Sequence, residues 1–280
     1  MMDIDVEEFD QVNYAHLRDA NNLMDRIIDE KGYEFDTVMD IGCGSGRVTY
    51  LLDSRIHCHK IFALDIDLKS VKYATHRHAS PRIQYSLQDI SVPWAQLDPK
   101  IQQLEGKVDL IFSNRVLHWI ENKQQAVANF YRLLKPGSGS LYANVTTLWD
   151  LFYDLPEEER KEYERMIYIP NEEEQVEQLH QLFEKSRFDS INIESTILRQ
   201  HYPSEQFKSV ILPYFPNLTK KYMVEKNGHK RNQIMASGLY EYIKNAFLRL
   251  YCREIFTTKN GQKSSEFELT YGQIRIVAQK

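Results

Sequence analysis

The sequence has few of the features that mark secreted or membrane-spanning proteins. Its 280 residues include only three cysteines, Cys43, Cys58 and Cys252, and their spacing fits neither a metal site nor a disulfide pattern. Such sparse cysteine usage is typical of a reducing compartment. No apolar run approaches the roughly 18 residues that a membrane span needs. The first residues are acidic where a signal peptide would be basic, so we expect a cytoplasmic protein.

The chain also lacks an excess of positively charged residues. Lysine and arginine total 35 against 40 aspartates and glutamates, which gives a formal net charge of −5. Proteins that track phosphate backbones usually carry a basic excess, so nucleic acid is not an expected partner. Hydrophobic residues make up 42% of the chain, and this length can bury a large core. We therefore expect a globular protein that binds neither nucleic acid nor membrane; self-association as a homodimer stays open.

Short apolar segments alternate with amphipathic segments over the first half of the chain. Apolar side chains at helical spacing predict an opening helix. Strands that alternate with helices form right-handed βαβ units, so the pattern predicts an α/β fold with a doubly wound, Rossmann-like sheet. The predicted helices span residues 14–30, 47–52, 69–76 and 123–134, and the predicted strands span residues 37–41, 60–65, 83–87, 108–113 and 140–146.

The alternation ends after residue 146. The remaining chain predicts helical insertions between the last strands, and we expect these insertions to form a lid. Helical patterns cover residues 148–188, 206–215 and 238–252, and strand patterns cover residues 191–199 and 267–277.

The sharpest pattern is the stretch Asp40-Ile41-Gly42-Cys43-Gly44-Ser45-Gly46, which lies between the first strand and the next helix. Glycines at this place let a ligand approach the backbone closely, and the helix N-terminus attracts the ligand's negative end. The spacing is D-x-G-x-G-x-G, whereas dinucleotide enzymes use G-x-G-x-x-G. An NAD-dependent dehydrogenase is therefore the less favoured function for this fold.

Two acids follow the next two predicted strands. Asp65 ends the second strand, where an acid can accept hydrogen bonds from both ribose hydroxyls of a nucleoside. Ile66 beside it can cover one face of a flat base. Asp89, next to Ile90 after the third strand, offers an acceptor for an exocyclic amine. A tight turn without a ligand, with an acid that only caps the next helix, is the alternative that each feature alone leaves open.

These residues resemble the signatures of the class I S-adenosylmethionine-dependent methyltransferases over about residues 36–146. In that family the glycine loop lies under the amino-acid part of the cofactor, the second-strand acid holds the ribose and the third-strand acid contacts the adenine. The resemblance implies S-adenosyl-L-methionine as the cofactor and no metal. The positions that it implies for cofactor binding are Asp40, Gly42, Cys43, Gly44, Gly46, Asp65, Ile66, Asp89, Ile90 and Ser113.

The resemblance also suggests how a single domain over residues 1–280 is divided. Residues 1–35 would form an N-terminal helix that covers the cofactor, residues 36–146 the cofactor-binding core, and residues 147–280 the helical lid insertions with the last strands.

The stretch Leu117-His118-Trp119-Ile120 after the fourth strand bears on which molecule accepts the methyl group. It resembles the insect juvenile hormone acid O-methyltransferases, as do Asn13, Arg18, Asp19 and Ala20 near the N-terminus. This resemblance implies methyl transfer to the carboxylate of an apolar small-molecule acid of the juvenile hormone acid or farnesoic acid type. Such a carboxylate is already ionised at neutral pH and needs no general base. An aromatic packing residue beside a helix-capping histidine is the alternative interpretation of the same stretch.

His16 stands where that family presents a glutamine to the substrate carboxylate. It shares a helix face with Ala20 and Leu23, so it points toward the edge of the core. A histidine there can be a core residue, a donor to the carboxylate, or a base for another acceptor. We predict that the catalytic set is His16 and Trp119 as hydrogen-bond donors, with His118 holding the loop.

Two other functions remain open at this point. One is a methyltransferase for a hydroxyl, an amine or a polar acid, with a histidine as base. The other is a non-catalytic relative that binds the cofactor or a lipid. Aromatic and aliphatic residues in the insertions either pack them onto the sheet or line an apolar pocket: Trp149, Phe152, Tyr153, Tyr168, Phe207, Ile211, Tyr214 and Phe215.

Overall fold

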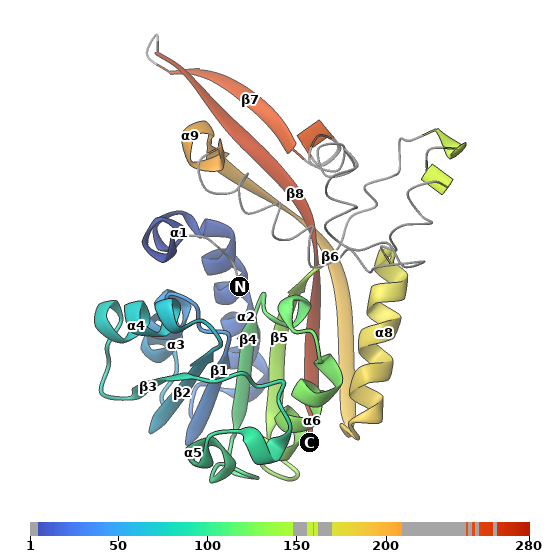
Figure 1. Cartoon of the computed structure of the whole chain (residues 1–280). Coiled ribbons are helices and arrows are strands. Elements are labelled where there is room, and N and C mark those ends of the chain that lie inside the picture. Colours follow the sequence, from blue (N-terminus) through green and yellow to red (C-terminus); the bar gives the residue numbers. More distant parts are fainter. Residues whose placement is uncertain are drawn as a thin grey trace.

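One mixed sheet organises the fold in the computed structural model (Figure 1). The structure describes residues 5–147, 156–158, 160–161, 170–208, 245, 248–249, 252–259 and 262–280. The strand order is β3-β2-β1-β4-β5-β8-β6, and β7 pairs with β8 off this path. The strands are β1 (Thr37–Ile41), β2 (Lys60–Asp65), β3 (Ile83–Leu87), β4 (Leu110–Asn114), β5 (Ser140–Thr146), β6 (Ser190–Pro203), β7 (Cys252–Lys259) and β8 (Gln262–Gln279).

The first five strands are parallel to one another, and β8 runs antiparallel to β5, β6 and β7. Parallel strands joined by helices place all their carboxyl ends at one edge of the sheet, with a topological switch point between β1 and β4. The predicted α/β, doubly wound Rossmann-like sheet is therefore confirmed.

Helices cover both faces of this sheet. The α-helices are α1 (Val6–Val12), α2 (Tyr14–Lys31), α3 (Arg47–Arg55), α4 (Leu68–Arg77), α5 (Pro99–Gln102), α6 (Lys123–Leu133), α8 (Glu172–Lys185) and α9 (Ser204–Gln206), and the 3₁₀ turns are η1 (Trp94–Gln96) and η2 (Leu117–Trp119). Because neighbouring residues of a strand point to opposite faces, Val38 joins the apolar layer under α2, whereas Met39 joins the layer under α6 and α8. The core thus holds α2 rigidly against the sheet.

The fold differs from the expectations in several places, and the short helices α5 and α9 are among the elements that were not predicted. Helix α1 was not predicted; Asp5 caps its N-terminus by accepting hydrogen bonds from the backbone of Glu7 and Glu8. The pattern over residues 238–252 was extended too far as a helix, because Cys252 begins strand β7. All eight residues of β7 pair there with β8. The β7–β8 hairpin rises beyond the rest of the sheet (Figure 1).

The insertions are only partly described. Within the predicted helix over residues 148–188, α8 is observed, and within residues 206–215 the structure describes residues 206–208. Phe207 is fully buried and stacks on Phe267 with ring centroids 4.5 Å apart. The other aromatic and aliphatic residues named for the insertions lie outside the described residues: Trp149, Phe152, Tyr153, Tyr168, Ile211, Tyr214 and Phe215.

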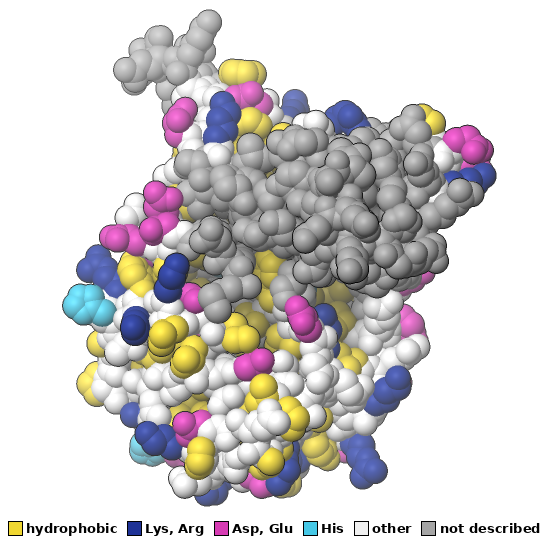
Figure 2. Space-filling model, in the orientation of Figure 1, with side chains coloured by type: hydrophobic (Ala, Val, Ile, Leu, Met, Phe, Trp, Pro, Cys, Tyr) yellow, Lys and Arg dark blue, Asp and Glu magenta, His cyan; other side chains and the backbone are white. Residues whose placement is uncertain are grey.

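Charged side chains of both signs are interspersed over the described residues of the face in Figure 2. This distribution agrees with the small net charge of the chain, −5. Of the helices that the structure describes, none combines the length and the apolar character needed to cross a membrane.

Candidate active site

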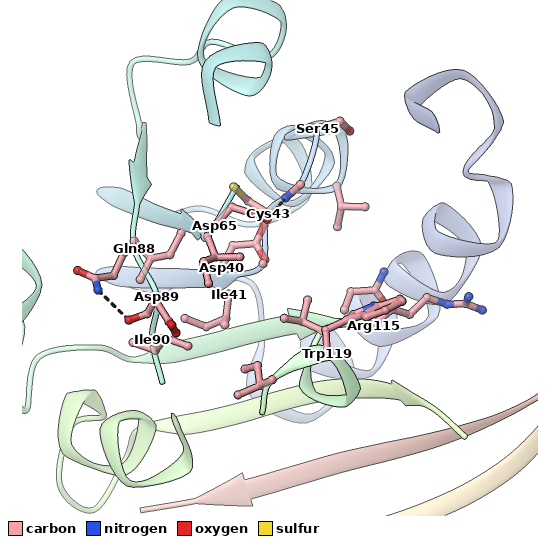
Figure 3. A pocket seen from close by; sticks show the side chains of 18 of the residues that line it. Asp40, Ile41, Cys43, Ser45, Asp65, Gln88, Asp89, Ile90, Arg115 and Trp119 are labelled. Atoms are coloured by element: carbon pink, nitrogen blue, oxygen red, sulfur yellow. Dashed lines mark hydrogen bonds between the residues drawn. The ribbon is translucent and has the colours of Figure 1, made fainter. Parts of the chain in front are cut away.

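A cavity of about 430 Å³ opens at the carboxyl ends of β1, β2, β3 and β4, with α1 and α2 on its other side (Figure 3). This is the edge at which open α/β sheets bind their ligands. Three acids, Asp40, Asp65 and Asp89, lie toward one end of the cavity, whereas Arg115 and Trp119 lie toward the other. Most of the predicted site residues line it: His16, Asp40, Gly42, Cys43, Gly44, Asp65, Ile66, Asp89, Ile90 and Trp119.

Three predicted residues lie near the cavity without lining it. Gly46 caps the N-terminus of α3 and packs against α4, where an added Cβ would meet Ala74. Ser113 is fully buried and donates a hydrogen bond from Oγ to the carbonyl of Ile41, 3.3 Å away, which ties β4 to β1. His118 is buried behind Trp119, with the ring centroids 5.2 Å apart.

The glycine loop brings its backbone to the cavity at one residue in particular. Gly44 has φ +52°, and a Cβ built there would meet no atom within 4 Å. The same atom at Gly42 would come within 2.3 Å of the Val116 side chain. Gly42 therefore makes room for the neighbouring loop, while Gly44 leaves the backbone open to a ligand.

Asp65 shapes the loop as well as facing the cavity. Its Oδ2 accepts a hydrogen bond from the backbone N–H of Gly44, and its Oδ1 accepts one from that of Asp67, both at 2.8 Å. Burial raises the pKa of this carboxyl, while the backbone donors oppose the rise. Each carboxylate oxygen can accept further hydrogen bonds, so the ribose assignment is compatible with this geometry.

The next loop presents a second acid at the same end. Ser91 donates from its backbone N–H and its hydroxyl to Oδ1 of Asp89, at 2.8 and 2.6 Å. Both bonds converge on one oxygen, so the other oxygen can accept from a ligand. Ile66, 60% exposed, lines the cavity with an apolar side chain that would lie against a flat base.

Asp40 is the third acid and the most deeply buried. It is 2% exposed, and Oδ2 accepts a hydrogen bond from the Thr49 hydroxyl at 2.6 Å. Burial and the nearby charge of Asp65, opposed by the hydrogen bond from Thr49, raise the pKa of Asp40 to about 7. The charge on this end of the cavity therefore changes near neutral pH.

Replacing Asp40 by asparagine is expected to stabilise the ligand-free protein at pH 8 by roughly 2–4 kcal/mol and to change little at pH 4. The folded-state pKa, about 7, lies above the unfolded value of ~3.9. The folded protein therefore binds this proton more tightly, and the resulting stability is present below ~3.9 and lost as the pH rises through about 7. Urea unfolding at pH 4, 6 and 8 measures the difference. Asp29→Asn, at an exposed position on α2, is the control, and parallel pH curves for the two variants would contradict the expectation.

Helix α1 closes the cavity from above the glycine loop. The carboxylate of Asp10 accepts a hydrogen bond from the Ser45 hydroxyl at 2.5 Å, and Arg47 donates to the carbonyl of Asp10. Phe9 and Asn13 line the cavity from this side. Sequence reasoning did not assign Phe9 or Asp10 to the site, and it named Asn13 only for its resemblance; the Asp5 cap before an amphipathic turn was the available signal.

The acceptor end of the cavity is formed by α2 and η2. His16 lies edge-on to Phe9, with ring centroids 5.0 Å apart, and burial together with Arg115 holds the pKa of His16 well below its usual range. The pKa of His118 is lowered in the same way, and its Nδ1 lies 3.4 Å from the backbone nitrogen of Thr146, which donates to it. Both histidines are therefore neutral at pH 7, and His118 holds the loop rather than facing the cavity.

Arg115, which sequence reasoning also missed, brings a cation to the same end. It lines the cavity, and its guanidinium pairs with Asp19 at 2.6 Å. Asp19 is far from it in the chain, so no local pattern announces the pair.

A family model described as "Methyltransferase domain" matches residues 39–142, which carry the glycine loop, Asp65 and Asp89. The strand order and the site geometry agree with this match. Residues 39–142 form a class I S-adenosylmethionine-dependent methyltransferase domain.

Two curated relatives are named for the molecules they methylate. Residues of the chain are 27% identical to the malonyl-[acyl-carrier protein] O-methyltransferase of Calditerrivibrio nitroreducens, over 42% of this chain and 41% of that protein. They are also 27% identical to the juvenile hormone acid O-methyltransferase of Bombyx mori, over 58% of this chain and 60% of that protein. The chain thus spans only about half the length of these relatives.

A solved structure shows the same fold. Phosphoethanolamine N-methyltransferase 2 of Haemonchus contortus, in complex with S-adenosyl-L-methionine, superposes with a TM-score of 0.52 at 16% identity. The superposition covers 92% of this chain and 52% of that one.

The residues of the methyltransferase domain fit its cofactor. The space above Gly44 suits an amino acid, and Asp65 at the end of β2 suits a ribose. Asp89 after β3 and the apolar Ile66 suit a flat base with an exocyclic amine. Asn13, 4% exposed, has an Oδ1 atom without a hydrogen-bond partner in the described part of the chain. A buried acceptor of this kind is costly unless a ligand supplies a donor.

Proposed function

We propose that this protein transfers a methyl group from S-adenosyl-L-methionine to the carboxylate of an apolar small-molecule acid of the farnesoic or juvenile hormone acid type. The observation that carries the proposal is the composition of the acceptor end, where neutral His16 and Trp119 lie beside the cationic Arg115. Donors and a cation suit an acceptor that is already an anion. The family resemblance of the Leu-His-Trp stretch in η2 points the same way.

For this reaction, the main role of the protein is to position the acceptor and to remove water from it. The cofactor, when bound, supplies an activated methyl group on a sulfonium. His16 and Trp119 donate hydrogen bonds to the acceptor carboxylate and hold one oxygen in line with that group. The walls from α1 and η2 exclude water, which leaves the carboxylate more reactive. Alignment of this kind contributes roughly 7–11 kcal/mol in favourable cases.

The lowered histidine pKa values change how the alternative with a histidine base can be tested. Deprotonation of His16 or His118 would occur well below pH 6.5, because burial and Arg115 disfavour the charged form of each ring. A pH–rate profile between pH 6 and 8 is then flat with respect to these histidines for a carboxylate acceptor and for a base-assisted acceptor alike. The identity of the methylated product separates the two instead.

The decisive experiment follows a labelled methyl group from S-adenosyl-L-methionine into a panel of acceptors. The panel contains farnesoic acid, juvenile hormone acid, a saturated fatty acid, farnesol and a control without acceptor. Base-labile label on the terpenoid acids is the expected result, since esters hydrolyse in base and ethers do not. Label on farnesol alone would favour a hydroxyl acceptor. Cofactor binding without transfer to any acceptor would favour a non-catalytic relative.

A polar acid is the second candidate acceptor, because the cationic Arg115 at this end of the cavity, although paired with Asp19, favours an acceptor with additional negative charge. The malonyl-[acyl-carrier protein] relative is named for such a substrate. Malonyl-coenzyme A is therefore added to the panel, and label on it alone would replace the apolar acid.

Replacing Trp119 by phenylalanine is expected to lower turnover on the accepted acid about 10–100-fold, the effect of one lost hydrogen bond to an anion. The affinity for S-adenosylhomocysteine should stay within about twofold, because Trp119 lines the acceptor end of the cavity. Steady-state kinetics and calorimetry measure the two quantities. Trp94→Phe, in η1, is the matched control. A Trp119 variant that loses cofactor affinity in proportion to turnover would place this indole at the cofactor instead.

A further inference from the structure

The loop after β4 leaves the sheet through an unusual backbone conformation. Arg115 has φ +62°, in the left-handed region that residues with a Cβ rarely adopt. Its backbone N–H donates to the carbonyl of Asn144 at 2.8 Å. Such a conformation persists where the surrounding contacts over-determine the residue. The side chain of Arg115 supplies further contacts of this kind.

The Arg115 guanidinium lies between α2 and β8. Nε donates to Oδ2 of Asp19 at 2.8 Å, and the guanidinium carbon lies 4.3 Å from the ring centroid of Tyr271. The Tyr271 hydroxyl in turn donates to the Asp19 carboxylate, with its two oxygens 2.9 and 3.1 Å away. Asp19 is fully buried and also accepts from Arg18. One carboxylate thus joins three segments that are distant in sequence.

The same contacts connect the two predicted donors. His16 lies one helical turn before Asp19 on α2, and Trp119 ends η2, which begins two residues after Arg115. Figure 3 shows Arg115 and Trp119 together at the α2 side of the cavity. Asn114 adds a second link, since its Nδ2 donates to the carbonyl of His16 at 3.0 Å.

We propose that Arg115 is a positioning residue for the methyl acceptor: by pairing with Asp19, it sets the separation between His16 on α2 and Trp119 on η2. The inference rests on the proposed function for the role of the two donors, but the contact itself does not depend on it. Without the guanidinium, the loop is free to relax from its left-handed residue and to carry Trp119 away from α2.

Arg115→Ala is a usable variant because it leaves no buried carboxylate without a partner. Asp19 keeps Arg18 and the Tyr271 hydroxyl. Removal of Asp19 itself would strand two arginines, and a buried charge that loses its partner is strongly destabilising. The experiment therefore changes the arginine and keeps the aspartate.

The first measurement is the ¹⁹F spectrum of the full chain labelled with 5-fluorotryptophan. The chain has three tryptophans, and Trp119→Phe and Trp94→Phe assign two of the resonances. We expect Arg115→Ala to shift or broaden the Trp119 resonance and to leave that of Trp94 in place. Arg115→Lys, which keeps the charge and can still reach Asp19, should restore part of the wild-type position.

The second measurement compares cofactor binding with turnover. Arg115→Ala should bind S-adenosylhomocysteine within threefold of wild type and lose 10–100-fold in kcat/KM for the acid that the wild type methylates. Partial recovery in Arg115→Lys is expected here too. A purely structural role would move cofactor affinity and turnover together.

Arg132 offers a matched control, because it makes the same two kinds of contact far from the cavity. It pairs with Glu105 at 2.6 Å and lies 4.1 Å from the ring centroid of Trp94. Arg132→Ala should move the Trp94 resonance and leave both the Trp119 resonance and methyl transfer unchanged. A Trp119 resonance that stays in place in Arg115→Ala, or undiminished transfer, overturns the positioning role. A wild-type protein that methylates no acid contradicts the proposed function instead, and the spectra still test whether the Arg115–Asp19 pair positions Trp119.

Discussion

Replacing Asp65 by alanine is expected to weaken binding of S-adenosylhomocysteine by 10²–10³-fold, or about 3–4 kcal/mol. The carboxylate contributes in two ways. It is the acceptor for the ribose in the proposed assignment, and it holds the backbone N–H groups of Gly44 and Asp67. Hydrogen bonds to an ionised carboxylate are stronger than neutral ones, so the loss of the ribose bonds and the loss of the loop bonds both weaken binding. Isothermal titration calorimetry near pH 7.5 measures the change.

Two further variants separate these contributions. Asp65→Asn keeps one acceptor oxygen for the loop but turns an amide N–H₂ toward the other backbone donor, so an intermediate loss is expected. Asp98→Ala removes an acid that likewise accepts from a backbone N–H, as the N-cap of α5, but does not line the cavity. It should bind the cofactor product as the wild type does. An Asp65→Ala variant with wild-type affinity would remove this acid from the site.

The parts of the fold that sequence reasoning predicted are those with local signals. β1 was predicted over residues 37–41 and is observed as Thr37–Ile41, because an apolar run ends there at a glycine cluster. The residues that line the cofactor end follow from the same logic. Asp65 ends β2 and Asp89 lies two residues after β3, and the carboxyl ends of parallel strands meet at one edge of the sheet.

The parts of the site that sequence reasoning missed depend on contacts between residues that are distant in sequence. Asp10 reaches Ser45 across the cavity, and Asp19 meets both Arg115 and Tyr271. Nothing in the neighbourhood of any of these residues indicates its partner, since the pairs form only after α1, α2 and β8 pack on the sheet. The acceptor end depends on these pairs, so its description required the structure, whereas the cofactor end did not.

Replacing Gly42 by alanine is expected to destabilise the protein by about 3 kcal/mol. The residue has φ +75°, where a Cβ costs roughly 1–2 kcal/mol. The new methyl group would also lie 2.3 Å from Cγ2 of Val116, and such overpacking typically costs about 1–3 kcal/mol. Urea unfolding of the ligand-free protein measures the loss.

Gly44→Ala is the informative comparison, because the two substitutions are expected to impair different properties, stability at Gly42 and cofactor binding at Gly44. At Gly44 the backbone angle is milder, φ +52°, and the added methyl group meets no atom within 4 Å. That group would stand in the space where the cofactor is proposed to lie. We expect a stability loss near 1 kcal/mol but a cofactor affinity at least tenfold weaker.

The clash at Gly42 also predicts a rescue. Val116→Ala removes the methyl groups that the new Cβ would meet, so the double variant Gly42→Ala/Val116→Ala should regain part of the stability lost by Gly42→Ala alone. The same change should not restore cofactor binding in Gly44→Ala, where Val116 is not involved. Additive losses in the first pair would mean that backbone strain, and not the contact with Val116, makes glycine necessary at position 42. Equal effects of the two glycine substitutions on stability and on binding would contradict the separate roles assigned to them.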